Sequence, residues 1–399
     1  MSGPDLRRVV AVLGLSQIVS WGCLYYGFAA LQSSITADTG WSATSVTAAF
    51  SLALVVSAGV GVWVGRHLDS HGPRLVMIGA TVLAVPGMVT IAAAPSLPWF
   101  YAGWMLVGAA MAGTLYPPAF AALTRWGGQD RVRALTAVTL AGGLASTVFA
   151  PLAAAVDAAA GWRTAYLVLT SVAVGVTLPL HWWGLRHRWT RPAASIPAAS
   201  SRHDTTATRV ATTRPFVALA LANALVALAA FAVVVNMVPM LREQGMSTQT
   251  AALVLGLGGV GQVIGRIGYA RLAASAGVTT RGVVVAAAVA VFTAAFAVAP
   301  PVAWMVITLG MLLGLARGLH TLVHATAVTD RWGPTSYGRL NGILTAPALA
   351  TSAAAPFAGA LLASATGSYG AAFLVLAAVA AAGAVLMVAA TPPFRPDPT

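Results

Sequence analysis

The stretch GRHLDSHGPR, residues 65–74, is polar and lies between two apolar runs. Residues 42–64 precede it and residues 75–94 follow it. Each run has about the 20 residues that a helix needs to cross the hydrocarbon core of a bilayer. A short polar turn between two such runs predicts a helical hairpin in a membrane, with the turn at one surface.

The composition of the whole chain agrees with a membrane location. The 399 residues are 58% hydrophobic and only 8% charged, whereas soluble domains carry roughly 25% charged residues. All 22 basic residues are arginine and most lie in short connectors, as in the cytoplasmic loops of multi-pass proteins. No nucleic-acid-binding module accompanies them, so we expect no nucleic-acid partner. A single cysteine, Cys23, excludes an intrachain disulfide.

Apolar runs recur along the chain and predict an all-α membrane protein with twelve transmembrane helices. The expected spans are 9–36, 42–64, 75–94, 99–123, 134–156 and 164–184, then 215–241, 248–269, 282–299, 302–328, 340–365 and 369–390. The first run is too long for a signal-peptide core, so we expect it to be retained as a span. The asymmetry of the arginines places both termini in the cytoplasm.

A polar segment divides the twelve runs into two sets of six. Residues 185–214 are rich in Pro, Ser, Thr and Arg and have no apolar face to bury, which predicts a cytoplasmic linker. The expected domains are therefore an N-terminal six-helix bundle, residues 1–184, and a C-terminal six-helix bundle, residues 215–399.

The two halves repeat each other in sequence. DTGWS, residues 38–42, parallels EQGMS, residues 243–247, at an offset of 205. RWGGQDRVR, residues 125–133, parallels RWGPTSYGR, residues 331–339, at an offset of 206. Matching segments lie on the same side of the membrane, which indicates a parallel duplication. Such repeats build secondary transporters, in which the halves move about a central site.

With twelve spans, this repeat and the turn at residues 65–74, nearly the whole chain resembles the major facilitator superfamily. The family signature after the second span is matched by Gly65, Asp69, Gly72 and Arg74, whereas His67, Ser70 and Pro73 depart from it. The resemblance implies a transporter that works by alternating access between its bundles. No nucleophile constellation, nucleotide loop or metal cage indicates an enzyme, and we expect no cofactor.

The same turn is expected to form a cytoplasmic gate. Gly65 and Gly72 would permit a tight turn, and Asp69 could accept hydrogen bonds from a neighbouring helix end or pair with Arg133 or Arg125. In the family this turn helps to hold the cytoplasmic side closed, a role that would include Arg74. The alternative is a solvated turn whose arginines only reflect the excess of positive charge in cytoplasmic loops.

Shorter segments point to a branch of the family. YYGFAAL, residues 25–31, and YGRLNGIL, residues 337–344, resemble the bacterial monocarboxylate-porter-like branch. The resemblance implies a small organic anion moved with a proton, in a bacterial cytoplasmic membrane, by a protein functional as a monomer. Efflux of amphipathic compounds stays open, although APLAAA, residues 150–155, has alanine at each glycine of the antiporter pattern. A non-transporting membrane sensor is a further alternative.

Ionisable residues within the apolar runs are the first candidates for substrate contact, because a charge at membrane depth is costly. Arg317, His320 and His324 lie on one face of the tenth expected span. The planar guanidinium of Arg317 suits a carboxylate, so Arg317 is predicted to bind the anion, unless groups within the protein satisfy it. His320 is the candidate for proton coupling, or else a neutral, hydrogen-bonded histidine. His320 and His324 have metal-pair spacing but no third ligand, so no metal site is expected.

Polar and aromatic residues in other spans are the remaining candidates for substrate contact. They are Gln17, Trp21, Tyr25 and Tyr26 in the first span, Tyr116 in the fourth and Asn236 in the seventh. Each could equally pack or hold helices together.

Overall fold

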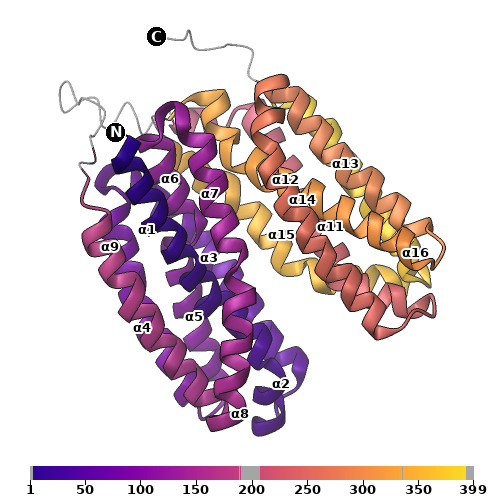
Figure 1. Ribbon diagram of the computed structural model, residues 1–399, viewed down its shortest axis with the longest axis horizontal. Coiled ribbons are helices and arrows are strands. Elements are labelled where there is room, and N and C mark those ends of the chain that lie inside the picture. The colour runs from indigo at the N-terminus through magenta and orange to yellow at the C-terminus, as the bar shows by residue number, and fades with distance from the viewer. Residues whose placement is uncertain (1–2, 188, 190–206, 335, 392–399) are drawn as a thin grey trace. The chain divides into compact units, whose positions relative to one another are not determined.

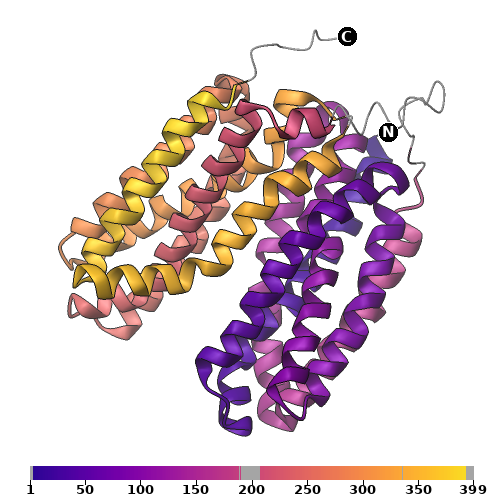
Figure 2. The same ribbon diagram turned by 180° about the vertical axis from the view of Figure 1, so that it is seen from behind.

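The structure is a computed structural model that describes residues 3–187, 189, 207–334 and 336–391. Every element of regular structure in these residues is a helix. The chain forms two compact units, each a bundle of long helices packed side by side (Figures 1 and 2). The first unit holds the described residues of Met1–His203 with Pro334–Ala346, and the second holds those of Asp204–Gly333 with Pro347–Thr399.

The helices of the first unit follow the first six expected spans. They are α1 (Gly3–Trp21), η1 (Gly22–Tyr26), α2 (Gly27–Thr39), α3 (Ala43–His71), α4 (Pro73–Ala93), α5 (Leu97–Thr114), α6 (Tyr116–Trp126), η2 (Gly128–Asp130), α7 (Arg131–Gly143), α8 (Ala145–Val172), η3 (Ala173–Thr177) and α9 (Leu178–Gly184). The second unit contains α11 (Arg214–Glu243), α12 (Thr248–Ser275), α13 (Val278–Val298), α14 (Ala303–Trp332) and α16 (Tyr369–Ala389). One helix, α15 (Tyr337–Thr366), begins in the first unit and continues into the second.

The described helices confirm a multi-pass, all-α membrane fold. Eleven segments among the described residues are long and apolar enough to cross a membrane. One of them, Gly128–Gly184, is divided at Gly161, whose φ of 80° lies in the left-handed region, so this segment covers the fifth and sixth expected spans. Many large apolar residues are exposed, including Trp63, Val291 and Phe357 at 58%, 61% and 71% exposure. Lipid is the environment that makes such exposure favourable.

The fourth expected span is broken. Leu115, between α5 and α6, has φ −79° and ψ −158°, an extended conformation. Pro117 and Pro118 follow after Tyr116; proline has no N–H, so residues 117 and 118 cannot donate the hydrogen bonds that would continue α5 across Leu115. The expected span 99–123 is therefore two helices that meet at Leu115.

The internal repeat is visible in the local geometry of both units. The hydroxyl oxygens of Ser42 and Ser247 each accept a hydrogen bond of 3.1 Å at a helix start, from the backbone N–H of Ser45 and Thr250. Gly161 and Gly367 have nearly identical φ angles, 80° and 82°. These positions are separated by the same spacing as the sequence repeats.

An exposed polar contact joins α2 to α8. The indole N–H of Trp162 donates to an Asp38 carboxylate oxygen at 2.9 Å, and Arg163 forms an ion pair with the same oxygen. The hydrogen bonds from Trp162 and Arg163, in that order of importance, lower the pKa of Asp38 from its ordinary value.

Glycines allow α12 and α14 to pack at very short range. Methyl groups at Gly261 or Gly265 would overlap the backbone of α14, and at Gly314 or Gly318 the backbone of α12. The sequence GLGGVG, residues 256–261, therefore serves helix packing within the membrane. The predicted linker lies mostly outside the described residues, so the domain boundaries at residues 184 and 215 stay a prediction.

Candidate functional site

Arg317 lies on α14 in the second unit and lines a small cavity. The cavity has a volume of about 20 Å³ and is bounded mainly by apolar residues of α11, α12, α13 and α14. The guanidinium carbon lies 5.4 Å from the ring centre of Phe231 on α11. This space holds about one water molecule, so an organic anion would need a wider opening beside the guanidinium.

The two histidines of α14 have different surroundings. The Nε2 atom of His320 is buried and has no hydrogen-bond partner among the described residues. The Nδ1 atom of His324 lies 3.1 Å from Oδ1 of Asn223 on α11. Since the Asn223 Nδ2 group donates to the Leu219 carbonyl at 2.8 Å, its Oδ1 faces the ring and accepts the proton of Nδ1. His324 therefore ties α14 to α11.

Four predicted residues of the first unit gather into one aromatic cluster. The ring of Trp21 lies 5.2 Å from that of Tyr25, 6.4 Å from that of Tyr26 and 5.0 Å from that of Tyr116. Tyr25 and Tyr26 belong to the π-helical turn η1, a rare element that often occurs at functional sites. The Tyr116 hydroxyl donates to the Thr139 carbonyl at 3.4 Å. The cluster joins the first and fourth expected spans, and the Tyr116 hydroxyl links it to the fifth.

The two predicted amides have neighbours in their own unit. Gln17 is fully buried, and its Nε2 group donates to the carbonyls of Thr114 and Leu115 at 2.8 and 3.3 Å. Asn236 is also buried, donates to the Ala232 carbonyl at 2.8 Å and packs against Gly359 of α15. Gln17 thus links two helices by hydrogen bonds, whereas the hydrogen bond of Asn236 stays within α11. The substrate roles of both amides stay predictions.

Asp69 accepts two hydrogen bonds from the first turn of α15. The backbone N–H groups of Gly338 and Arg339 donate to its carboxylate at 2.9 and 2.8 Å. Arg125 and Arg339 add electrostatic attraction. The expectation that Asp69 accepts hydrogen bonds from a neighbouring helix end is confirmed, and the favourable charge at a helix N-terminus explains it. Arg133 forms its ion pair with Asp130 at 3.5 Å instead.

The predicted role of Gly65 in a tight turn is wrong, because α3 continues through His71. A methyl group at Gly65 would overlap the Gly338 carbonyl, and one at Gly342 would approach the Gly61 carbonyl oxygen to 2.7 Å. Glycines four residues apart on both helices therefore let α3 and the start of α15 touch.

The turn itself is made by Gly72, whose φ is 79°, as predicted. Trp189, which sequence reasoning missed, covers this turn, and its indole N–H donates to the Asp69 carbonyl at 3.1 Å. Arg74 lies over the ring of Trp182, with its guanidinium carbon 5.0 Å from the ring centre.

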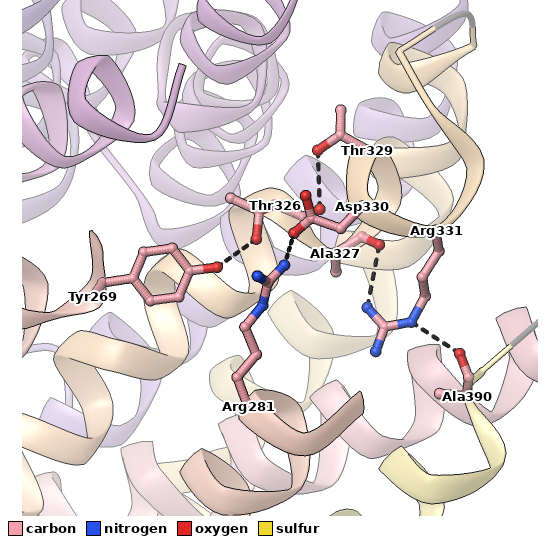
Figure 3. A network of polar contacts seen from close by, with 8 residues as sticks. All are labelled: Tyr269, Arg281, Thr326, Ala327, Thr329, Asp330, Arg331 and Ala390. Carbon is pink, nitrogen blue, oxygen red and sulfur yellow. Dashed lines mark hydrogen bonds and ion pairs between the residues drawn. The ribbon is translucent and has the colours of Figure 1, made fainter. Parts of the chain in front are cut away.

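A buried polar network in the second unit was also missed (Figure 3). Arg281 of α13 forms an ion pair with Asp330 of α14, and both side chains are only 8% exposed. The hydroxyls of Tyr269 and Thr326 lie 2.6 Å apart beside it, and Arg331 donates to the Ala390 carbonyl at 2.9 Å. In the sequence, Arg281 and Arg331 look like ordinary arginines of cytoplasmic connectors. The acidic residue Asp330 beside Arg331 is the one sequence feature that could have indicated a buried ion pair.

Comparison with known proteins identifies the family. Residues 13–309 match the family model of the Major Facilitator Superfamily. The chain belongs to this superfamily. It is therefore a multi-pass membrane transporter and not an enzyme. The expected all-α membrane fold and the family are confirmed, whereas the count of twelve helices and the cytoplasmic termini stay predictions.

Curated relatives match parts of the chain. Monocarboxylate transporter 11 of Mus musculus is 31% identical over 241 residues, which are 59% of this chain and 51% of that protein. The oxalate:formate antiporter of Oxalobacter formigenes is 28% identical over 173 residues, 43% of this chain and 40% of that protein. The chain thus spans about half the length of these relatives or less.

Solved structures resemble the chain over nearly its full length. The human organic anion transporter MFSD10 superposes with a TM-score of 0.76 at 16% identity, covering 97% of this chain and 100% of that one. The fucose:proton symporter of E. coli superposes with a TM-score of 0.71 at 13% identity, covering 95% of this chain and 97% of that one. At these identities the likeness supports the fold.

Proposed function

We propose that this transporter moves a small organic anion of the monocarboxylate type, coupled to protons, by alternating access of its two helix bundles. The observation that carries the proposal is Arg317, a permanent cation within a membrane-spanning helix that lines a cavity. A guanidinium binds a carboxylate through two parallel hydrogen bonds. The names of the mouse and Oxalobacter relatives, a monocarboxylate transporter and an oxalate:formate antiporter, point to the same class of substrate.

The remaining predicted residues take roles around this cation. Trp21, Tyr25, Tyr26 and Tyr116 supply rings and hydroxyls for the organic part of the substrate, and Asn236 is a further polar group. His320, three residues after Arg317 on α14, is the candidate to exchange the coupled proton. Gln17 lies four residues before Trp21 on α1 and acts on the position of the cluster, not as a direct ligand of the substrate. The location that fits is a bacterial cytoplasmic membrane, with the protein functional as a monomer.

The cytoplasmic gate is part of the same proposal. Asp69 and the start of α15 hold together while the cytoplasmic side is closed, with Gly65, Gly72 and Arg74 around the contact. Arg133 would take part only after leaving its ion pair with Asp130. Releasing the two hydrogen bonds from Gly338 and Arg339 would let the contact open.

The substrate role of Arg317 is tested by uptake into proteoliposomes. Purified wild type, R317Q and the matched control R271Q, which removes an exposed arginine of α12, are given radiolabelled formate, lactate or oxalate. We expect uptake by R317Q to be at least about tenfold lower than uptake by wild type, since a hydrogen bond to a charged group contributes roughly 1.5–3 kcal/mol. R271Q should keep wild-type uptake. Equal uptake by R317Q and wild type would refute the assignment.

The coupling role of His320 is read in the same vesicles. An inwardly directed proton gradient should stimulate uptake by wild type, and H320Q should transport without that stimulation. Stimulation that persists in H320Q would exclude His320 as the coupling residue.

A further inference from the structure

We infer that Gln17 is a positioning residue: its side-chain amide replaces the backbone N–H that Pro118 lacks and so holds the break between α5 and α6. This bond would set the position of Tyr116 in the first unit, whatever substrate the protein carries.

The break leaves a specific acceptor to be satisfied. In an uninterrupted helix the N–H of residue 118 would donate to the carbonyl of residue 114. Pro118 has no N–H, and residue Thr114 is only 2% exposed. An unsatisfied carbonyl in an apolar environment is costly, so a donor must come from another part of the chain.

Gln17 supplies that donor. Its Nε2 group lies 2.8 Å from the Thr114 carbonyl oxygen and 3.3 Å from that of Leu115, the two carbonyls at the break. The side chain is 0% exposed, so water does not compete for these bonds. The amide must present its nitrogen to the two carbonyls, because its own oxygen would be repelled by them.

The break and the aromatic cluster both involve α1 and α6. Tyr116 begins α6 directly after Leu115. Its ring lies 5.0 Å from that of Trp21, which follows Gln17 by one turn of α1. The bond from Gln17 therefore fixes the point from which Tyr116 projects toward the rest of the cluster.

A related side-chain hydrogen bond between the first and fourth helices occurs in the second unit. Asn223 follows Gln17 by 206 residues (223 − 17), the offset of the internal repeat. His324, which Asn223 contacts, follows Pro118 by the same 206 residues (324 − 118). In the second unit α14 is continuous, so no backbone carbonyl is freed by a proline and the amide accepts from a histidine instead. In each half, an amide of the first helix thus contacts the fourth helix, and the two contacts lie about one helical turn apart along it.

The test is a double-mutant cycle on the purified protein. Pro118→Ala restores an N–H to residue 118, so the chain can close the helix across Leu115 and bond the Thr114 carbonyl without the Gln17 donor. We expect Q17L to lower the Tm by several degrees in the wild-type background and by much less in the P118A background. Q32L is the matched control, because Gln32 donates to Thr47 within the first unit at 2.7 Å; its effect should be the same in both backgrounds.

Equal losses of Tm from Q17L in the two backgrounds would overturn the inference. If Q17L alone does not fold, recovery of folded protein in Q17L/P118A supports the inference and failure to recover contradicts it. These measurements need no substrate, so their failure is distinguishable from failure of the proposed function.

The positioning role is read from transport kinetics. With the anion that wild type transports, Q17L should raise KM by about tenfold, the effect of one lost hydrogen bond, while kcat changes little. P118A should restore part of the affinity. An unchanged KM in Q17L would show that Gln17 only stabilises the fold and would refute the positioning role.

Discussion

Arg281 and Asp330 are ordinary charged residues in the sequence, and their partnership appears only in the structure. Each is 8% exposed, and each neutralises the other at the ends of α13 and α14 (Figure 3). The Arg133–Asp130 pair has the same chemistry but exposures of 85% and 60%. Burial makes the difference, since water screens an exposed pair and a buried charge depends on its partner.

Removing one partner of the buried pair should destabilise the protein strongly. D330N leaves the Arg281 charge buried without compensation, and we expect a loss of about 3–5 kcal/mol. The measurement is thermal or denaturant unfolding of the purified protein in detergent. D130N is the control and should cost about 0–1 kcal/mol. The double variant R281Q/D330N should be more stable than D330N, and similar losses for D330N and D130N would contradict the argument.

At the scale of elements, glycine spacing determines which helices meet. Gly61 and Gly65 on α3 face Gly338 and Gly342 on the start of α15. The glycines of α12 and α14 bring those helices equally close. Membrane helices gain stability from close packing and not from leaving water, so a single side chain added at such a contact separates the helices along their length.

A bulky residue at this contact should separate α12 from α14. In G314L the new side chain would overlap the Gly258 carbonyl, and we expect a loss of about 1–3 kcal/mol or more. The Tm of the purified protein measures the loss. G259L is the matched control: Gly259 lies on α12 with open space around it, so its Tm should stay at or above that of wild type. A stable G314L would disprove the packing role.

At the scale of the whole molecule, the superfamily works by changing which side of the membrane its site faces. The start of α15 lies in the first unit while most of the helix lies in the second. The contact of Asp69 with that start is therefore made by a helix that both units share. The proposed gate would then open when the first turn of α15, which belongs to the first unit, is released from Asp69.

Loss of the Asp69 carboxylate should make the gate open more often. D69A removes the acceptor of the Gly338 and Arg339 N–H groups, and uptake should fall as the closed state is weakened. Opening is measured by labelling Y337C, in a C23S background, with an impermeant maleimide; Tyr337 is 2% exposed, so labelling reports opening. Labelling should be faster with D69A and unchanged with D130A. Equal labelling rates with and without D69A would exclude the gate.

The sequence by itself determined the membrane class, the helical character of the spans and the superfamily, and it named a helix end as one of two possible partners of Asp69. It could do so because lipid forces apolar runs into helices and because a duplicated signature keeps its spacing. The tertiary structure alone decided that Gly65 packs instead of turning, that Gln17 satisfies a carbonyl freed by Pro118, and that Arg281 finds Asp330. These depend on which helix faces approach each other, and contacts between residues far apart in sequence leave no periodic signal along the chain.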